Sequence, residues 1–248
     1  MNRANASPLS EPQVTLKQAA SPLIQCYKVR SWKPLLPKGN LAISPVVAQG
    51  LADLLPTLLC GEASAEMVFT QTIQSFSSTH FPDLHNELCR IVFDEIRHGE
   101  LLLNLSHYLP SPSKRDTAKQ AVRFLRNLAS DDLSIHLARL SAIDIGVCIV
   151  LSSVCRAQPI AENDYLYDLL TSIRRDEGRH VRVTRRCAEV LGLDIATERK
   201  EKIQVLKAFS SLLSRQDAAF IAIGVDPEQL RTHFKKRCAY LLRLRQIK

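Results

Sequence analysis

DEIRH at residues 94–98 and DEGRH at residues 176–180 are two copies of one five-residue pattern. Both stretches lie in segments whose apolar periodicity predicts α-helices, and residues three apart share one face of a helix. Each copy therefore presents a glutamate and a histidine together, Glu95 with His98 and Glu177 with His180. Carboxylates and imidazoles are hard and intermediate metal ligands, so the repeat predicts a site for iron or manganese shared by two helices.

A further carboxylate precedes each copy at the same distance. Glu62 lies 33 residues before Glu95, and Asp144 lies 33 residues before Glu177. Turn-forming sequence falls about halfway along both intervals. A turn halfway between two helical residues brings them to the same height on neighbouring antiparallel helices. We therefore expect two helical hairpins that each bring a carboxylate and a Glu-x-x-His pair to one level of a bundle.

Each copy also contains an aspartate and an arginine. A metal-bound histidine commonly donates its second ring N–H to a carboxylate. We expect Asp94 and Asp176 each to hold the histidine of the other hairpin. We also expect Arg97 and Arg179 to pair with these aspartates, or else to face solvent. Glycine inside a helix is unfavourable by about 1 kcal/mol, and four of the eight glycines fall near the proposed ligands, which predicts a site that needs space: Gly61, Gly99, Gly146 and Gly178.

The duplicated motif, with its preceding carboxylates, resembles the ferritin-like di-iron carboxylate superfamily. Within it, the pattern is similar to the p-aminobenzoate N-oxygenase group of ferritin-like oxygenases. The resemblance covers about residues 44–191 and implies a four-helix bundle that binds two iron ions, cycling between Fe2+ and Fe3+, with manganese as an alternative. It implies six metal ligands: Glu62, Glu95, His98, Asp144, Glu177 and His180. The four carboxylates among them are also implied to be the catalytic groups.

Two positions depart from the N-oxygenase group. Ile173 stands where that group carries an additional histidine ligand. Asp144 stands in place of the usual glutamate, and its shorter side chain is expected to leave one metal position more open or asymmetric.

The resemblance implies an O2-dependent di-iron oxidoreductase, a monooxygenase or oxidase. We expect a small organic substrate, hydroxylated, N-oxygenated or desaturated as in natural-product metabolism, and an external electron donor. A tRNA-modifying hydroxylase is one alternative, and a non-catalytic iron-handling or peroxide-scavenging protein is another. The substrate pocket is expected beside the metals, although core packing is an alternative role for each of its residues: Glu66, Phe69, Phe93, Ser141, Cys148 and Ile173.

The chain as a whole is predicted to be all-α. The proline-rich residues 1–43 are expected to form an N-terminal arm that is partly disordered. Residues 44–192 form the ferritin-like bundle, with helices expected over 44–77, 81–110, 132–156 and 161–191. Residues 193–248 form a C-terminal helical extension packed on the bundle, with helices near 198–213 and 227–245.

The composition indicates the class of the protein and its expected location in the cell. Of its 248 residues, 46% are hydrophobic and 23% charged, as in soluble globular proteins. We expect no apolar run to approach the roughly 20 residues that a membrane-spanning helix needs. The N-terminal residues lack the apolar core of a signal peptide, so we expect a cytoplasmic protein with no membrane partner. The seven cysteines form no CxxC pair and are expected to be reduced.

Positive charge gathers at the C-terminal end. The formal net charge is +8, and residues 228–248 hold seven basic side chains against one acidic one. A solvated helix face is one interpretation, and a docking surface for an acidic carrier protein or RNA is the other. The sequence also leaves open whether the chain forms a homodimer.

Overall fold

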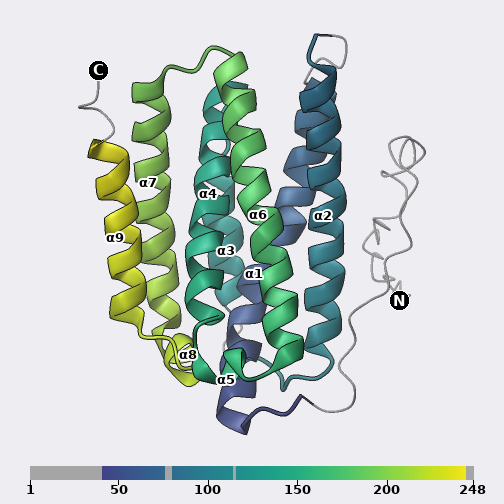
Figure 1. Ribbon diagram of the computed structural model, residues 1–248, viewed down its shortest axis with the longest axis vertical. Helices are drawn as coiled ribbons and strands as arrows, with labels where there is room; N and C mark the ends of the chain where they lie inside the picture. Colours follow the sequence, from purple (N-terminus) through teal and green to yellow (C-terminus); the bar gives the residue numbers. More distant parts are fainter. Residues whose placement is uncertain (1–40, 76–79, 114–115, 244–248) are drawn as a thin grey trace, which may run out of the picture. The chain divides into compact units, whose positions relative to one another are not determined.

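The computed structural model describes residues 41–75, 80–113 and 116–243, which belong to one compact unit (Figure 1). Within these ranges the chain is helical and contains no strand, which confirms the all-α prediction. The predicted N-terminal arm, 1–43, lies outside the described residues except for its last three positions.

Four long helices make up the centre of the described chain (Figure 1): α1 (Pro45–Ser75), α2 (Pro82–Ser106), α4 (Leu133–Val154) and α6 (Asp164–Val190). Helix α1 packs against α2, α4 packs against α6, and α2 contacts α6. The bounds of these helices agree with the four predicted helices to within a few residues at each end, the usual uncertainty of helix ends.

Local sequence explains where α4 and α6 begin and where α6 ends. The side chain of Asp132 accepts hydrogen bonds from the first backbone N–H groups of α4, and Asn163 does the same for α6. These caps satisfy N–H groups that have no partner within the helix. Gly192 follows α6 with a φ of 86°, a left-handed conformation that favours glycine.

Shorter helices connect the long ones. The predicted partly helical connection between α2 and α4 contains α3 (Thr117–Arg126), which packs on α1. Two short helices were not predicted, α5 (Gln158–Ala161) in the turn before α6 and α8 (Asp217–Ala222) against α1. Both have fewer than two full turns, too short for an apolar period to identify them.

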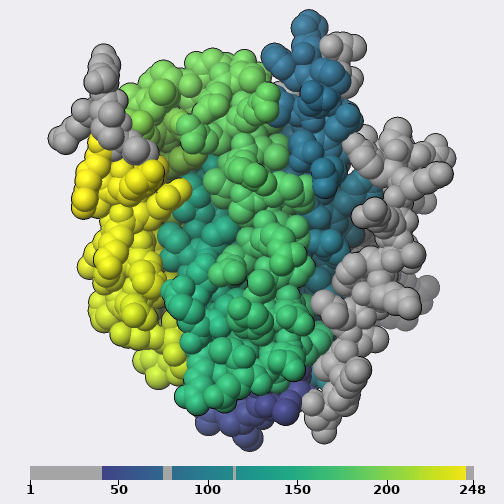
Figure 2. Space-filling view, viewed as in Figure 1, coloured from purple at the N-terminus to yellow at the C-terminus, as the bar shows by residue number. Residues whose placement is uncertain are grey.

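The C-terminal helices cover the outer side of α4. Helix α7 (Ile195–Leu213) packs on α4, and α9 (Pro227–Arg243) packs on α7 and α4. Figure 2 shows α9, in yellow, beside the surface of α4 and α6. The ring of Phe209 on α7 lies against Gly146, so closely that a Cβ atom at this position would overlap the ring.

The expectation that no apolar segment reaches membrane-spanning length is wrong for two helices. Residues Pro45–Gln74 of α1 and Leu133–Val154 of α4 are long and apolar enough by length and composition. The described protein buries 61% of the apolar window in α4 and 39% of it in α1, and the core helix of a soluble protein passes the same test. The arrangement is consistent with a water-soluble protein.

The contact between Gly146 and Phe209 yields a stability prediction. Gly146→Ala should lower the free energy of unfolding by about 1–3 kcal/mol, because the added methyl forces the packed ring to move. Gly61→Ala is the matched control, since a Cβ there meets nothing within 4 Å. It should raise the free energy of unfolding by about 0.5–1 kcal/mol, the difference in helix propensity. Urea denaturation of the metal-free protein measures both; equal effects would contradict the account.

Candidate metal centre

The four long helices bring the six predicted ligands into the protein interior. Helix α1 carries one of them, α2 carries two, α4 carries one, and α6 carries two. Each of these side chains is buried: Glu62, Glu95, His98, Asp144, Glu177 and His180.

Four of these residues form one tight group. A ligand atom from each of Glu62, Glu95, His98 and Glu177 lies within 4.8 Å of the others. His98 Nδ1 lies 3.2 Å from Glu62 Oε2 and 3.5 Å from Glu177 Oε1. A buried group of carboxylates and imidazole at this spacing could hold a metal ion.

His180 occupies the corresponding position on the second hairpin. Its Nδ1 lies 3.1 Å from Glu95 Oε1 and 3.5 Å from Glu177 Oε2, and its ring centroid lies 6.0 Å from that of His98. Both oxygens of Glu177 are thus used, one toward each histidine. Glu95 behaves in the same way, because its other oxygen lies 3.9 Å from His98 Nδ1. Each of these two carboxylates thus has one oxygen toward each histidine.

Asp144 breaks the symmetry of the two hairpins. On the first hairpin Glu62 reaches His98, but no ion pair within the described residues joins Asp144 to His180. An aspartate is one methylene shorter than a glutamate, which accounts for the difference. Asp144 is nevertheless buried, and its Oδ2 has no hydrogen-bond partner.

The aspartates of the motif connect the two hairpins. His98 Nε2 lies 3.3 Å from Asp176 Oδ2 on α6, and His180 Nε2 lies 3.3 Å from Asp94 Oδ2 on α2. Arg97 forms an ion pair with Asp176, and Arg179 forms one with Asp94. These contacts fix the orientation of both rings and turn each Nδ1 toward the carboxylates.

Buried polar atoms that make no hydrogen bond indicate whether a metal ion fits the centre. Four buried atoms at the centre make no hydrogen bond of suitable geometry: Glu62 Oε2, His98 Nδ1, Asp144 Oδ2 and His180 Nδ1. The two Nδ1 atoms lie 3.2 and 3.1 Å from carboxylate oxygens, but the angles do not suit a hydrogen bond. Buried polar atoms normally have partners, and leaving one without costs about 1–3 kcal/mol. All four are metal-ligating atoms, so a bound cation would satisfy them together, and the residues fit a metal centre.

Burial and the neighbouring charged groups shift the pKa values of the predicted metal ligands. Burial and the neighbouring Glu177 raise the pKa of Glu95 well above its ordinary value, and they do the same for Asp144. Burial opposes ionisation of Glu177 too, but the two histidines outweigh it and lower the pKa of Glu177 to about 2. Burial acts to lower the pKa of both histidines, yet the surrounding carboxylates raise it well above the usual range.

The four glycines near the centre lie in different surroundings. A Cβ at Gly99 would come near only Glu62, and a Cβ at Gly61 or Gly178 would meet nothing within 4 Å. Gly146 makes room for Phe209 of α7 rather than for the metal centre. The expectation of a site that needs space is therefore wrong for Gly146.

The predicted pocket residues lie in different environments. Phe69 is fully buried with its ring centroid 6.4 Å from that of His180, while Ser141 and Ile173 are core residues. Glu66 is partly buried, which raises its pKa, and Phe93 is also partly buried. Only Cys148 lines one of the larger surface pockets.

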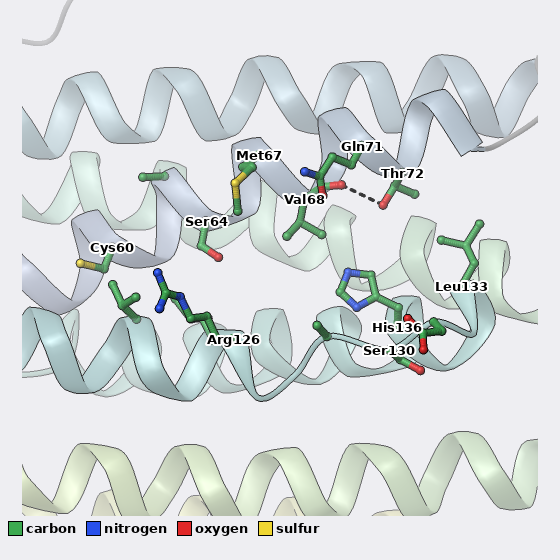
Figure 3. A pocket seen from close by; sticks show the side chains of 15 residues that line it. Cys60, Ser64, Met67, Val68, Gln71, Thr72, Arg126, Ser130, Leu133 and His136 are labelled. Atoms are coloured by element: carbon green, nitrogen blue, oxygen red, sulfur yellow. Dashed lines mark hydrogen bonds between the residues drawn. The ribbon is translucent and has the colours of Figure 1, made fainter. Parts of the chain in front are cut away.

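The sequence did not predict the pocket shown in Figure 3. It has a volume of about 740 Å³ and lies between α1, α3 and the start of α4. Gln71 lines it, and this residue is nine positions, or two and a half helical turns, after Glu62. The pocket therefore faces the side of α1 opposite the metal centre. Its other labelled lining residues include Met67, Arg126 and His136.

A small apolar cavity lies inside the four helices. Its volume is about 40 Å³, enough for one or two molecules the size of water or O2. Leu58 and Leu102 line it, one helical turn from Glu62 and His98 respectively. The cavity begins about one helical turn from the centre and is too small for an organic molecule.

Comparison of the chain with protein-family models, curated proteins and solved structures finds no match. The geometry of the buried side chains supports the metal centre.

The contacts between hairpins predict that the aspartates control metal affinity. Asp176→Asn should weaken Mn(II) binding about 10–100-fold, because the amide no longer holds His98 in its ligating tautomer. Asp168→Asn, at an exposed position on the same helix, should leave the affinity unchanged. Calorimetric titration measures both affinities. Equal affinities in the two variants would show that the Asp176 contact does not position the ligand.

The raised pKa values predict proton release on metal binding. Glu95, Asp144 and both histidines hold protons in the metal-free protein at higher pH than free side chains do. A metal ion binds only their deprotonated forms. Mn(II) affinity should therefore rise from pH 6 to pH 8, about tenfold per pH unit for each proton released.

Calorimetry in buffers of different ionisation enthalpy counts these protons directly. A pH-independent affinity with no proton release would contradict the prediction.

Proposed function

We propose that the chain is a ferritin-like di-iron protein that uses O2 to oxidise a small organic molecule. The observation that carries the proposal is the pair of crossed Glu-x-x-His motifs. Their Nδ1 atoms lack hydrogen-bond partners and face carboxylates whose two oxygens are divided between the histidines. In this proposal α1, α2, α4 and α6 are the ferritin-like four-helix bundle, with α3 in the crossover.

The ligand set divides between two ions. Glu62 and His98 would hold one, Asp144 and His180 would hold the other, and Glu95 and Glu177 would lie between them. When bound, iron at such a site supplies the redox chemistry that reduces O2. Asp94 and Asp176 hold the imidazole N–H groups, and the apolar residues around the centre exclude water.

We propose a cytoplasmic enzyme that receives electrons from an external donor, as the reaction class requires. A tRNA-modifying hydroxylase would bind tRNA in a salt-dependent manner. An iron-handling protein would consume no O2 beyond the oxidation of its own iron.

Anaerobic loading with Fe(II) tests the proposal. Wild-type protein should bind about two iron ions per chain, and the Glu95→Ala, Glu177→Ala double variant should bind about none. A matched control replaces Glu100 and Glu189, exposed glutamates on the same two helices, and should keep the metal. On admission of O2, reduced wild type should consume more O2 with a chemical reductant than its iron alone accounts for. No stoichiometric iron in the wild type, or full iron in the double variant, would overturn the proposal.

A further inference from the structure

A second pocket is lined by residues of α4, α6 and α9. Figure 2 shows the side of the molecule on which these helices lie. The volume of the pocket is about 600 Å³, within the range of pockets that bind organic ligands. Helices α4 and α6 contribute apolar or small residues, among them Ile145, Cys148 and Gly178. Helix α9 contributes Lys236 and Arg237. The pocket thus combines a mainly apolar floor with a cationic side.

The positive charges of this pocket are not balanced. Its lining includes Arg156, Lys236 and Arg237 but no carboxylate. In the described part of the chain none of these three side chains forms a salt bridge, and the buried Nε of Arg237 has no hydrogen-bond partner. The neighbouring Arg231 differs, because it pairs with Asp217 and Glu228. Unpaired cations around a concave surface attract an anion.

The floor of the pocket adjoins the metal centre. Gly178 follows the ligand Glu177, and Ile145 follows Asp144. Cys148 lies one helical turn after Asp144, and burial together with the carboxylates of Glu177 and Asp144 raises the pKa of its thiol to about 12. A Cβ at Gly178 would meet nothing within 4 Å, so the floor is open at that point. A ligand on this floor lies next to residues that carry the metal ligands.

The other pockets suit a substrate less well. The interior cavity is too small for an organic molecule, and the pocket between α1, α3 and α4 lies on the opposite side of α1 from Glu62 and includes Asp131 beside Arg126. Two smaller pockets, one on α3 and one between α7 and α9, are lined by helices that carry none of the predicted metal ligands. Of these pockets, the one between α4, α6 and α9 combines sufficient volume, one sign of charge and proximity to the centre.

We propose that the pocket between α4, α6 and α9 binds an organic anion, holding its charged group at Arg156, Lys236 and Arg237 and its apolar body against Cys148 and Gly178. The inference deepens the proposed function by assigning the substrate class. The inference rests on the proposed function only in taking the bound anion as the substrate that is oxidised. The binding of an anion does not itself depend on the proposed function.

The test compares 2-naphthoate with 2-naphthamide, two probes of one shape that differ in charge. Full-length protein should bind naphthoate at least about tenfold more tightly than naphthamide. Lys236→Gln with Arg237→Gln should abolish this preference, while Lys235→Gln, at the adjacent exposed position outside the pocket, should keep it. Gly178→Leu, which fills the floor without changing charge, should weaken the binding of both probes.

NMR line broadening by bound Mn(II) measures whether the probe lies close to the metal centre. In Mn(II)-loaded protein the ring protons of naphthoate should broaden in the NMR spectrum, and in Zn(II)-loaded protein they should stay sharp. Circular dichroism confirms that each variant is folded, and metal content is measured on the same samples.

The outcomes separate this inference from the proposed function. Equal binding of the two probes, or unchanged naphthoate binding in the Lys236, Arg237 variant, overturns the anion pocket even if iron binds normally. Binding without broadening by bound Mn(II) overturns its place beside the centre. If the chain binds no metal, the proposed function fails, and titration of the metal-free protein with both probes still decides the anion pocket.

Discussion

The buried charge between the four long helices is the constraint on which the structure depends. Four carboxylates and two imidazoles lie within the protein interior, where an uncompensated charge is strongly unfavourable. Two imidazoles cannot neutralise four carboxylates. The metal-free protein responds by holding protons, as the raised pKa values of Glu95 and Asp144 indicate. Divalent cations would replace these protons and supply the missing positive charge.

The contacts around this charge join two hairpins that are distant in sequence. Asp176 on α6 holds His98 on α2, and Asp94 on α2 holds His180 on α6. The ligands are therefore oriented by contacts that do not require a metal. The site is not fully symmetric, since Asp144 does not reach His180 as Glu62 reaches His98. On the side of Asp144 the α9 pocket approaches the centre, so the shorter ligand and the proposed substrate site lie on the same side.

The sequence predicted that the six buried carboxylate and histidine side chains would lie together, because their pattern repeats at fixed spacing. The 33-residue intervals, with a turn in the middle of each, predicted that α1 with α2 and α4 with α6 would bring these residues to one level. The pockets could not be predicted in this way, because they depend on how separate helices pack. Gly146 shows the difference: its neighbour Asp144 suggested a role at the site, whereas the contact with Phe209 arises from a helix that follows later in the chain. The short helices α5 and α8 carry too little periodicity to be recognised.

The most direct test of a metal centre between these helices is an anomalous difference map at the iron edge, from crystals grown anaerobically with Fe(II). The account predicts two peaks in the protein interior, one next to His98 Nδ1 and one next to His180 Nδ1, with Glu95 and Glu177 between them. Interior density without an anomalous signal, or iron found only at surface carboxylates, would contradict it.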